Sequence, residues 1–574
     1  MAEIHRFSCL YIQTGMKGHK YIFVVGGVMS GVGKGVATSS IGLLLQSRGF
    51  KISPIKIDPY LNVDAGTMNP TEHGEVFVMK NGLETDQDMG SYERFLGRDL
   101  NPENYMTGGM VYKSVIDRER ALGYGGKCVE PVPHIPEEVI RRIKRAGDKD
   151  KSDITIVEVG GTLGEYQSVM FIEAARTLQL ENPGDVLFVL VSYLPVPGKL
   201  GEMKTKPTQY AVRTMNSYGV NPSIVIARAE VPLDYKRKEK IAASSGIRVE
   251  QVISAPDVDS VYDVPLNFEK DHIAETLMRL LSLKPKKRIP ELTPWKGFVR
   301  KVHNGKKTVK IAMVGKYFAT GDFVLADSYL SVIEAVKYAA YKQNLKPIID
   351  WVAATDFEGK AAGKNLAKLR RYDGIIVPGG FGARGIEGKL KVIEYARTHK
   401  LPYFGLCYGM QLMVVEYARN VLGWKGAHTT EIDEKTKFPV IDIMPDQRKK
   451  MKEGDYGGSM RLGAYPAYLK ERTIARDAYK AEMVHERHRH RFEVNPEYVD
   501  AIAKAGLVFS GVSPSETLME IAELPRTKHP FFLGTQFHPE FTARPLTSHP
   551  LFDAFIKACL RQVGRGRQAA SKKK

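Results

Sequence analysis

Short apolar runs separated by polar, helix-compatible stretches recur along the first half of the chain. The runs occupy residues 21–25, 52–57, 154–159, 186–191 and 223–227. Val- and Ile-rich runs bounded by Gly, Pro or charged residues are typical of strands buried on both faces. A stretch such as 136–145, which lies between two of them, predicts a helix. This alternation predicts an α/β fold with a mostly parallel sheet and helices on both of its faces.

The same alternation returns in the second half of the chain, with apolar runs at 309–314, 348–352, 374–377 and 403–406. A chain of 574 residues is long enough for about two to four domains. We therefore predict a first α/β domain at 20–283 and a second at 308–561. Residues 284–307, rich in Pro and Lys, are predicted to link them. Residues 1–19 form a short extension, and 562–574 form a basic C-terminal tail that we expect to be disordered.

A cysteine lies between two glycines where an apolar run meets a predicted helix. The run 403–406 leads into Cys407, and a helix is predicted at 410–418. Gly405 and Gly409 complete the pattern G-x-C-x-G, the cysteine form of the nucleophile elbow. Glycines allow a backbone turn sharp enough to lift a side chain above the sheet. The alternative is an inert cysteine in an apolar core.

A second group of residues, far downstream, supplies partners for that cysteine. Gln536 to Glu540 read Gln-Phe-His-Pro-Glu. Pro539 favours an extended backbone at His538, so that His538 and Glu540 can point the same way. Alone, a His-Pro-Glu string means little. Together with Cys407 it indicates a nucleophile, a base and an orienting carboxylate.

A glycine-rich turn completes the features of an acyl-transfer site. The apolar run 374–377 leads into Pro378-Gly379-Gly380-Phe381-Gly382. Free backbone N–H groups of this turn, with that of Tyr408, could stabilise an oxyanion, although an ordinary tight turn is the simpler interpretation. The combination resembles the class I glutamine amidotransferases. The resemblance implies attack of the Cys407 thiolate on the glutamine carboxamide, a thioester and its hydrolysis. It also implies glutamine-binding residues, namely Gly380, Tyr408, Gly409, Met410, Gln411, Glu431 and Arg491.

The first domain begins with a possible phosphate-binding loop. The apolar run 21–25 is followed by Gly-rich residues 26–35 and a predicted helix at 36–48. Such a loop presents backbone N–H groups and a helix N-terminus to phosphate oxygens. Gly35 stands where the strict P-loop pattern requires Ser or Thr, and residues 27–34 fit a version with one extra residue. We therefore predict a P-loop-like, Rossmann-type domain, with a ligand-free βα turn as the alternative.

The missing hydroxyl raises the question of which residues hold Mg²⁺. Asp88 is one candidate, and Glu158, at the end of the run 154–157, is another. A carboxylate at the carboxyl end of a strand in an open α/β sheet lies where ligands bind. Either acid could instead be a solvated loop residue.

Several strings make the whole chain similar to the CTP synthase family. They occupy 26–35, 56–64, 66–68, 73–78 and 204–209 in the first half, and 378–382, 384–385, 387–388, the Cys407 elbow, 487–491 and 536–541 in the second. The resemblance extends from about residue 21 to about residue 560. It implies ATP-dependent amination of UTP: ATP phosphorylates O4 of UTP, and ammonia displaces the phosphate to give CTP.

The resemblance also implies a role for individual residues. Gly31, Val32, Gly33, Lys34, Gly35, Arg228 and Asp257 would bind ATP. Lys34 and Lys56 would act in phosphoryl transfer, and Asp88 and Glu158 would hold Mg²⁺. Ser30, Glu165, Gln167, Lys204, Thr205, Lys206, Pro207, Thr208, Gln209 and Lys240 would bind UTP or CTP. Arg384, Gly385 and Glu387 would form a lid that responds to GTP. GTP as activator, CTP as product inhibitor and a homotetramer are further expectations.

Two segments depart from the family pattern. Where the family has G-G-T-V-G-D-I-E, residues 160–167 place Glu165 for the Asp and Gln167 for the Glu. The segment 195–198, before Lys204, also differs. We expect altered nucleotide selectivity or product feedback, with the chemistry intact.

Composition and charge narrow the possible partners and cellular locations of the protein. The net charge of +19 could indicate nucleic acid or nucleotides as ligands. Much of the excess is local, at 284–288, 300–301, 306–307 and 561–574, and no RNA-binding or helix-turn-helix signature is present, so we do not expect nucleic acid as a partner. No apolar run reaches the length of a membrane span, and no signal peptide is predicted. The four cysteines show no C-x-x-C spacing, which favours a reducing, cytoplasmic location.

Three other classes stay open. A ligase of the cobyrinate amidase type joins similar domains but would lack 204–209. A nucleotide switch of the partitioning-ATPase type would leave Cys407, His538 and Glu540 without a role. A mainly structural, filament-forming protein is the third alternative.

Overall fold

The structure is a computed structural model that describes residues 18–27, 29–198, 202–315, 326–380, 382–452 and 457–571. The predicted extension 1–19 lies almost entirely outside the described residues. The described chain forms two compact units. The first unit comprises 18–64 and 91–299, and the second comprises 65–90 and 300–571. Residues 65–90, which the sequence placed in the first domain, are therefore grouped with the second unit.

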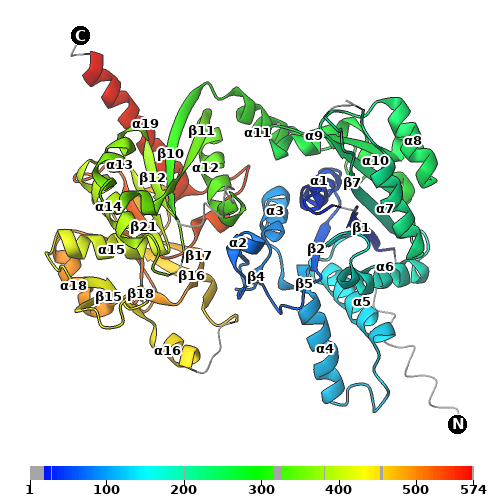
Figure 1. Cartoon of the computed structure of the whole chain (residues 1–574), viewed down its shortest axis with the longest axis horizontal. Coiled ribbons are helices and arrows are strands. Elements are labelled where there is room, and N and C mark those ends of the chain that lie inside the picture. Colours follow the sequence, from blue (N-terminus) through cyan, green and yellow to red (C-terminus); the bar gives the residue numbers. More distant parts are fainter. Residues whose placement is uncertain are drawn as a thin grey trace. The chain divides into compact units, whose positions relative to one another are not determined.

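The first unit is built on a seven-stranded sheet in the order β5-β2-β6-β1-β7-β8-β9 (Figure 1). Every neighbouring pair of these strands is parallel, as predicted. The strands are β1 (Lys20–Gly26), β2 (Ile52–Asp58), β5 (Tyr105–Thr107), β6 (Ile154–Val159), β7 (Val186–Tyr193), β8 (Ile224–Ala229) and β9 (Val252–Pro256).

Side chains of β1 alternate between two hydrophobic cores, one on each face of this sheet. Tyr21 and Phe23 belong to the core that also contains residues of α5 (Pro131–Asp150) and α6 (Val169–Glu181). Ile22 and Val24 belong to the other core, with residues of α1 (Lys34–Ser47), α9 (Val264–Lys270) and α10 (Ile273–Leu280). Successive side chains of a strand point to opposite faces, so a strand covered by helices on both sides must be apolar throughout. The remaining helices include α4 (Gly108–Arg120), α7 (Lys206–Ser217) and α8 (Tyr235–Ser245).

The second unit contains a nine-stranded sheet in the order β11-β10-β12-β13-β21-β20-β19-β16-β17. The strands are β10 (Lys307–Gly315), β11 (Leu345–Ala353), β12 (Gly374–Val377), β13 (Tyr403–Leu406), β16 (Arg461–Leu469), β17 (Met483–His490), β19 (Val508–Val512), β20 (Met519–Glu523) and β21 (Phe532–Thr535). Pairing is parallel from β11 to β21 and antiparallel beyond it. The carboxyl ends of β12, β13 and β21 therefore lie side by side, which is where ligands bind in open α/β sheets.

Helices of this unit include α12 (Leu330–Lys342), α14 (Ile386–Thr398), α15 (Tyr408–Asn420), α18 (Pro496–Lys504) and α19 (Pro550–Ser571). Residues 65–90 add α2 (Pro70–His73), the pair β3 (Phe77–Val78) and β4 (Glu84–Thr85), and the start of α3 (Gln87–Leu96). A small sheet is formed by β14 (Ala427–Thr429), β15 (Phe438–Ile443) and β18 (Phe492–Val494).

Two segments predicted to be irregular are helical. The predicted linker 284–307 contains α11 (Thr293–Asn304), whose Trp295 and Phe298 are buried. These aromatic side chains provide apolar contacts that stabilise a helix despite the surrounding Lys and Pro residues. The backbone of α19 continues to Ser571, so the tail is helical as far as that residue and our expectation of disorder is wrong there. Residues 572–574 of the predicted tail lie outside the described residues.

Candidate functional site

Cys407 occupies the sharp turn between β13 and α15. Its backbone has φ 50° and ψ −100°, a conformation that residues with a side chain rarely adopt. A Cβ on Gly409 would collide with the carbonyl oxygen of Val377, and one on Gly405 would lie 2.7 Å from the carbonyl carbon of Gly409. Both glycines are therefore required by close backbone approach. The predicted strand, elbow and helix are present in this order.

His538 and Glu540 follow β21, the strand beside β13. His538 Nδ1 lies 2.7 Å from Glu540 Oε1. We expected an extended backbone at His538, and its φ of −108° and ψ of 84° lie outside the helical region. Glu540 lies in the 3₁₀ turn that follows, Pro539–Thr542, and this turn brings the two side chains together. Burial opposes a charge on His538, but Glu540 and Cys407 outweigh it and raise the pKa of His538 to about 10. This electrostatic balance favours an imidazolium next to the sulfur.

The glycine-rich turn after β12 faces this pair. A Cβ on Gly379 would lie 3.0 Å from His538 Cε1 and 3.8 Å from the Cβ of Cys407. Gly382 N donates a hydrogen bond of 2.7 Å to Glu431 Oε1, which fixes the far end of the turn. A side chain at Gly379 would obstruct the space in front of the sulfur. The turn can therefore present backbone N–H groups to an oxyanion formed at Cys407.

A cavity of about 80 Å³ opens beside Cys407 within the second unit. Its walls include His538, Glu540, Gly380 and Arg489, and, from residues 65–90, Pro70, Glu75 and Val76. It has room for small molecules of the size of water or ammonia. Residues 65–90 thus enclose the space next to the nucleophile.

Arginines of β17 hold residues 65–90 in place. Arg487 Nη1 donates to the carbonyl oxygen of Val78 at 3.0 Å. Arg489 Nε donates to Glu84 Oε1 at 2.8 Å, and its Nη2 donates to the carbonyl oxygen of Gly66 at 3.3 Å. Arg489 is only slightly exposed, so the ion pair with Glu84 is shielded from water.

The glutamine-binding residues implied by the resemblance are distributed around this centre. Gly380 lines the cavity and Tyr408 is buried, with Lys389 Nζ 5.1 Å from the centre of its ring. Gln411 Nε2 donates to the carbonyl oxygen of Phe492 at 2.8 Å. Gly409 and Met410 lie in the first turn of α15 and are buried.

Arg491, also implied to bind glutamine, lies elsewhere. Its Nη1 is 2.8 Å from Gln447 Oε1 and 3.1 Å from Ser459 Oγ. Among the residues found to line the cavity, the arginine is Arg489. The role of Arg491 stays a prediction. In the string Arg-His-Arg-His-Arg, the period of two of a strand could have predicted that Arg487 and Arg489 lie on one face of β17 and that His488 and His490 lie on the other.

The predicted GTP lid lies at the start of α14. Arg384 is exposed, and Gly385, with φ 77°, precedes the helix in the left-handed conformation. Glu387 pairs with Arg419 at 2.9 Å. The lid prediction is not tested by these contacts.

In the first unit the glycine-rich loop leads from β1 into α1, which begins at Lys34. Gly31 and Gly33 have positive φ values of 70° and 84°. Lys34 Nζ donates to the carbonyl oxygen of Gly161 at 2.6 Å. Arg228 lies against the loop, with Nη1 3.4 Å from the carbonyl oxygen of Val32.

Other predicted nucleotide-binding residues lie around the same edge of the sheet. Arg228 Nη2 pairs with Asp257 Oδ1 at 2.5 Å, and Ser30 is exposed in the loop. Gly35 is buried in the first turn of α1. The structure thus brings the loop together with both residues, Arg228 and Asp257, that the family resemblance adds to it.

Lys56 and Glu158 form a buried ion pair of 2.9 Å at the carboxyl ends of β2 and β6. Glu158 also accepts a hydrogen bond from the hydroxyl group of Tyr92. A buried carboxylate with oxygen neighbours is a suitable magnesium ligand. Asp88, the other predicted ligand, belongs to residues 65–90 of the second unit. Among the described residues, no group of three or more His, Cys, Asp or Glu side chains forms a ready-made metal site.

Glu165 and Gln167 interact with each other. Gln167 Nε2 donates to Glu165 Oε2 at 2.6 Å, and Glu165 Oε1 accepts from the backbone N–H of Thr162 at 2.9 Å. The amide of Gln167 therefore bonds to the carboxylate at the other departure from the family pattern. A glutamate at 167 would place two negative charges side by side.

The string 204–209 forms the start of α7. Lys204 Nζ pairs with Glu202 Oε2 at 2.6 Å, and Thr205 precedes the helix. Thr208 Oγ1 lies 2.9 Å from Ser192 Oγ, and Gln209 Nε2 donates to Thr205 Oγ1 at 3.3 Å. The other predicted members of this set are Lys206 and Pro207, which begin α7, and Lys240, which is exposed on α8.

Comparison with known proteins covers nearly the whole chain. A family model for the CTP synthase N-terminus matches residues 20–283, and one for class-I glutamine amidotransferases matches 324–558. A CTP synthase of Thermococcus gammatolerans is 49% identical over 94% of this chain and 98% of its own length. The chain belongs to the CTP synthase family. Another CTP synthase, from Sulfolobus acidocaldarius, is 47% identical over 94% of this chain and 99% of its own length.

Among solved structures, the chain is similar to the glutaminase domain of the Trypanosoma brucei CTP synthase with bound acivicin. That match has 37% identity and a TM-score of 0.41, and it covers 44% of this chain and 94% of that domain. Membership of the CTP synthase family accounts for both the Cys407 elbow and the glycine-rich loop. In the described part of the chain, no helix is long and apolar enough to cross a membrane.

Proposed function

We propose that the chain converts UTP to CTP, using ATP and ammonia released from L-glutamine. The observation that carries this proposal is the coexistence, in one chain of the CTP synthase family, of the Cys407 centre and a P-loop-like glycine-rich loop. Neither a nucleotide switch nor a structural protein needs a nucleophile at an elbow with an adjacent His–Glu pair.

In the second unit, the sulfur of Cys407 attacks the glutamine carboxamide carbon. Backbone N–H groups of the turn after β12 and of Tyr408 donate hydrogen bonds to the developing oxyanion. His538 gives a proton to the departing ammonia and, with Glu540 holding its other ring nitrogen, then takes one from the water that hydrolyses the thioester. Ammonia is released into the adjoining cavity, which residues 65–90 close off.

In the first unit, the γ-phosphoryl group of ATP moves to O4 of UTP. Lys34 and the backbone N–H groups of its loop bind the phosphates, and Lys56, which pairs with Glu158, neutralises the transferring group in this proposal. Ammonia then bonds to C4, phosphate leaves with O4, and a proton is lost. Glu158 would hold Mg²⁺, which would supply neutralisation of phosphate charge when it is bound, and Asp88 is the second ligand that the family resemblance implies.

The regulatory and assembly properties implied by the family form part of the same proposal. GTP activates glutamine use through the lid at Arg384, CTP inhibits as product, and the chain forms homotetramers. A reactive thiol at Cys407 requires a reducing compartment, which favours the cytoplasm.

A direct assay tests the proposal. The purified chain is incubated with UTP, ATP and Mg²⁺, with either glutamine or ammonium, and CTP is measured by chromatography. We expect CTP from both nitrogen sources. ATP hydrolysis without CTP would instead support a nucleotide switch, and amidation of another acid without CTP would support a different ligase.

Gln167→Glu is expected to strengthen inhibition by CTP. A carboxylate can only accept hydrogen bonds, so it favours the amino group of CTP over the carbonyl group of UTP, and charge-assisted bonds are roughly twice as strong as neutral ones. We expect the inhibition constant of CTP to fall by about fivefold, equivalent to roughly 1 kcal/mol. Initial rates at several CTP concentrations measure it.

Gln167→Met is the matched control, because it keeps the length of the side chain without hydrogen-bonding groups. It should not strengthen inhibition. If Gln167→Glu is inhibited as weakly as the native chain, or more weakly, residue 167 does not face position 4 of the base.

Arg384→Ala is expected to weaken stimulation by GTP. An exposed guanidinium at the start of α14 can contact phosphates, and loss of a charge-assisted bond of about 1.5 kcal/mol raises the GTP concentration for half-stimulation about tenfold. Titration of glutamine-dependent CTP formation with GTP measures this, and ammonium-dependent formation should not change. Arg370→Ala, another exposed arginine of the second unit, is the control. Equal GTP dependence of the two variants would remove Arg384 from the lid.

A further inference from the structure

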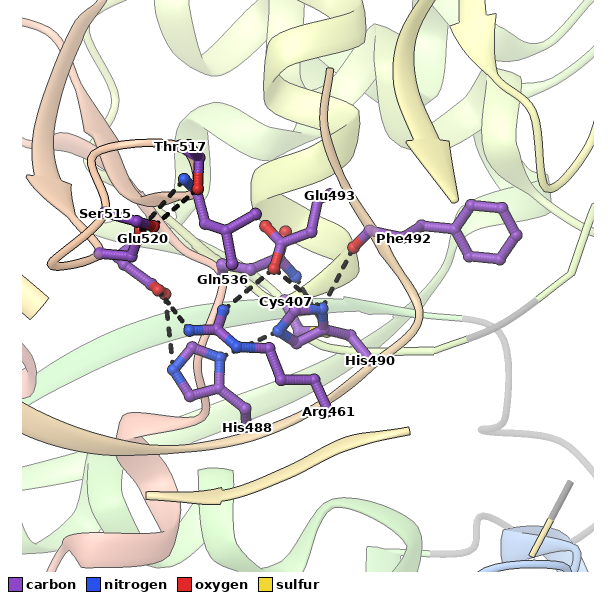
Figure 2. A network of polar contacts seen from close by, with 12 residues as sticks. Cys407, Arg461, His488, His490, Phe492, Glu493, Ser515, Thr517, Glu520 and Gln536 are labelled. Atoms are coloured by element: carbon purple, nitrogen blue, oxygen red, sulfur yellow. Dashed lines mark hydrogen bonds and ion pairs between the residues drawn. The ribbon is translucent and has the colours of Figure 1, made fainter. Parts of the chain in front are cut away.

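A network of buried polar side chains lies next to Cys407, on the side of β17 that does not bind residues 65–90. Figure 2 shows its members, which come from β16, β17, β18, β20 and the segment after β21. They are Arg461, His488, His490, Glu493, Glu520 and Gln536. All except Arg461 are almost completely buried. Buried polar groups are costly unless each hydrogen-bonding atom has a suitable partner, so the protonation of this network is tightly constrained.

The carbonyl group of Phe492 fixes the tautomer of His490. His490 Nδ1 lies 3.2 Å from this oxygen, which can only accept, so Nδ1 carries the hydrogen. Burial and the neighbouring Arg461 hold the pKa of His490 well below its usual value. His490 is therefore neutral, and its Nε2 is an acceptor.

The same reasoning determines the tautomer of His488. His488 Nδ1 lies 2.9 Å from His490 Nε2 and must donate to it. Burial and Arg461 also keep the pKa of His488 well below its usual value, so that His488 Nε2 is an acceptor. This atom lies 3.4 Å from Glu520 Oε2. Both of these atoms are buried without a hydrogen-bond partner among the described residues, so the chain of fixed tautomers ends at His488.

Arg461 balances the remaining charge. Its Nη2 donates to Glu520 Oε1 at 2.7 Å, and its Nη1 donates to Glu493 Oε1 at 3.0 Å. Glu493 Oε1 also lies 3.5 Å from the Nδ1 of His490, which carries a hydrogen. Burial and the charge of Glu520 hold the pKa of Glu493 well above its usual value, and burial also raises the pKa of Glu520. One guanidinium can neutralise only one of the two carboxylates, so the pair retains a proton.

On its other side, the carbonyl group of Phe492 is linked to Cys407. Gln411 Nε2 donates to this oxygen at 2.8 Å and also lies 3.3 Å from Gln536 Oε1. Because an amide nitrogen only donates, the oxygen of Gln536 must face it. Gln536 Nε2 is then turned to Cys407 Sγ, at 3.7 Å, as a donor. The orientation of the Gln536 amide follows from the same carbonyl group that fixes His490.

We propose that Gln536 is a catalytic residue that donates a hydrogen bond to the sulfur of Cys407, and that Gln411 is a positioning residue that is held by the Phe492 carbonyl group and fixes the orientation of the Gln536 amide. This inference rests on the proposed role of Cys407 as nucleophile. A donor at the sulfur stabilises the thiolate that attacks glutamine.

The other groups that face Cys407 are already assigned. His538 and Glu540 approach from the segment after β21, and the side chain of Arg489 lines the same cavity. The Sγ of Cys407 also lies 3.8 Å from the carbonyl oxygen of Arg489, which can only accept a hydrogen bond. Gln536 is therefore an uncharged donor that acts in addition to His538.

Gln536→Glu tests the contact with the sulfur. The variant keeps the shape of the side chain but replaces the donor with an acceptor. We expect kcat for glutamine hydrolysis to fall by at least about tenfold, with a smaller change in KM, because a hydrogen bond to a charged group is lost. Alkylation of Cys407 by iodoacetamide, measured without glutamine, should slow by a similar factor at pH 7, with its pH midpoint moved up. An unchanged alkylation profile overturns the role of Gln536.

Gln411→Met tests the orientation of the Gln536 amide. Methionine has a similar length but cannot donate to the Phe492 carbonyl group or to Gln536 Oε1. We expect alkylation of Cys407 without glutamine to slow by at least about fivefold, the effect of one hydrogen bond of about 1 kcal/mol. Native alkylation in this variant overturns the positioning role of Gln411.

Ammonium-dependent CTP formation serves as the folding check in every variant. If Gln411→Met does not fold, the alkylation profile of Gln536→Glu alone decides. Failure of the native chain to hydrolyse glutamine would overturn the proposed function. Normal hydrolysis in Gln536→Glu would overturn only this inference.

Discussion

Cys407→Ala is expected to abolish glutamine-dependent CTP formation and to leave ammonium-dependent formation largely intact. The variant lacks the sulfur that forms the thioester, and loss of a nucleophile of this kind lowers kcat on the order of 10⁶-fold. Cys407 has a strained backbone with φ 50°, but the strain is no greater for alanine, so the fold should persist. Parallel assays with glutamine and with ammonium, at saturating UTP and ATP, measure the two activities.

Cys559→Ala is the matched control, because Cys559 is also buried in the second unit but lies in α19, outside the nucleophile elbow. It should keep both activities. Loss of ammonium-dependent synthesis in a folded Cys407→Ala variant would contradict separate sites for the two half-reactions. Glutamine-dependent CTP formation at the rate of the native chain would show that another group is the nucleophile.

The Cys407 centre was predictable because its signals are local. Gly405 and Gly409 flank the cysteine, and the close approach of Gly409 to Val377 shows why no other residue fits there. The apolar runs before Cys407 and before the glycine-rich turn correspond to β13 and β12. The sequence could not show that β21 pairs with β13, yet this pairing is what brings His538 to the sulfur.

The placement of residues 65–90 was not predictable from local patterns. It depends on Arg487 and Arg489, which reach back across more than half of the chain to Val78, Gly66 and Glu84. Hydrophobic periodicity reveals no contacts between segments that are so far apart in the sequence. Sequence order alone therefore assigned this segment to the first domain.

Residues of the buried polar network around Arg461 carried a signal that was read only in part. The alternation Arg-His-Arg-His-Arg along β17 separates two faces, because successive side chains of a strand point in opposite directions. His488 and His490 face the buried network, whereas Arg487 and Arg489 bind residues 65–90. The partners of the histidines, Arg461 and Glu520, come from other strands, so only the structure could reveal the complete set.

The helix at α11 shows how composition can mislead. The Lys and Pro residues of 284–307 favoured a linker without regular structure. Trp295 and Phe298 lie three residues apart, which places both on one face of a helix, and the indole N–H of Trp295 donates to the carbonyl oxygen of Tyr262. Two buried aromatic side chains outweigh the surrounding charges because burial of each contributes about 1.5–3 kcal/mol.

Lys34→Ala is expected to abolish CTP formation from both nitrogen sources. Lys34 begins α1 after the glycine-rich loop, and its Nζ reaches the carbonyl oxygen of Gly161, at the strand end where phosphates are proposed to bind. Phosphoryl transfer depends on positive charge around the moving group, and removal of one such group typically costs on the order of 10²–10³-fold in kcat. Hydrolysis of glutamine at Cys407 should persist, because the nucleophile and its partners all lie in the second unit.

Three rates are measured on one preparation of each variant. They are the formation of CTP from ammonium, the formation of CTP from glutamine, and the release of glutamate from glutamine. Lys113→Ala is the control, since Lys113 is an exposed lysine of the first unit whose partner is Asp117, one turn away. Exposed ion pairs of this kind contribute little to stability, so all three rates should equal those of the native chain. Near-normal ammonium-dependent synthesis in Lys34→Ala would mean that the loop does not bind the phosphates of ATP. Loss of glutamine hydrolysis as well, in a variant that still melts cooperatively, would mean that the Cys407 centre depends on an occupied nucleotide site.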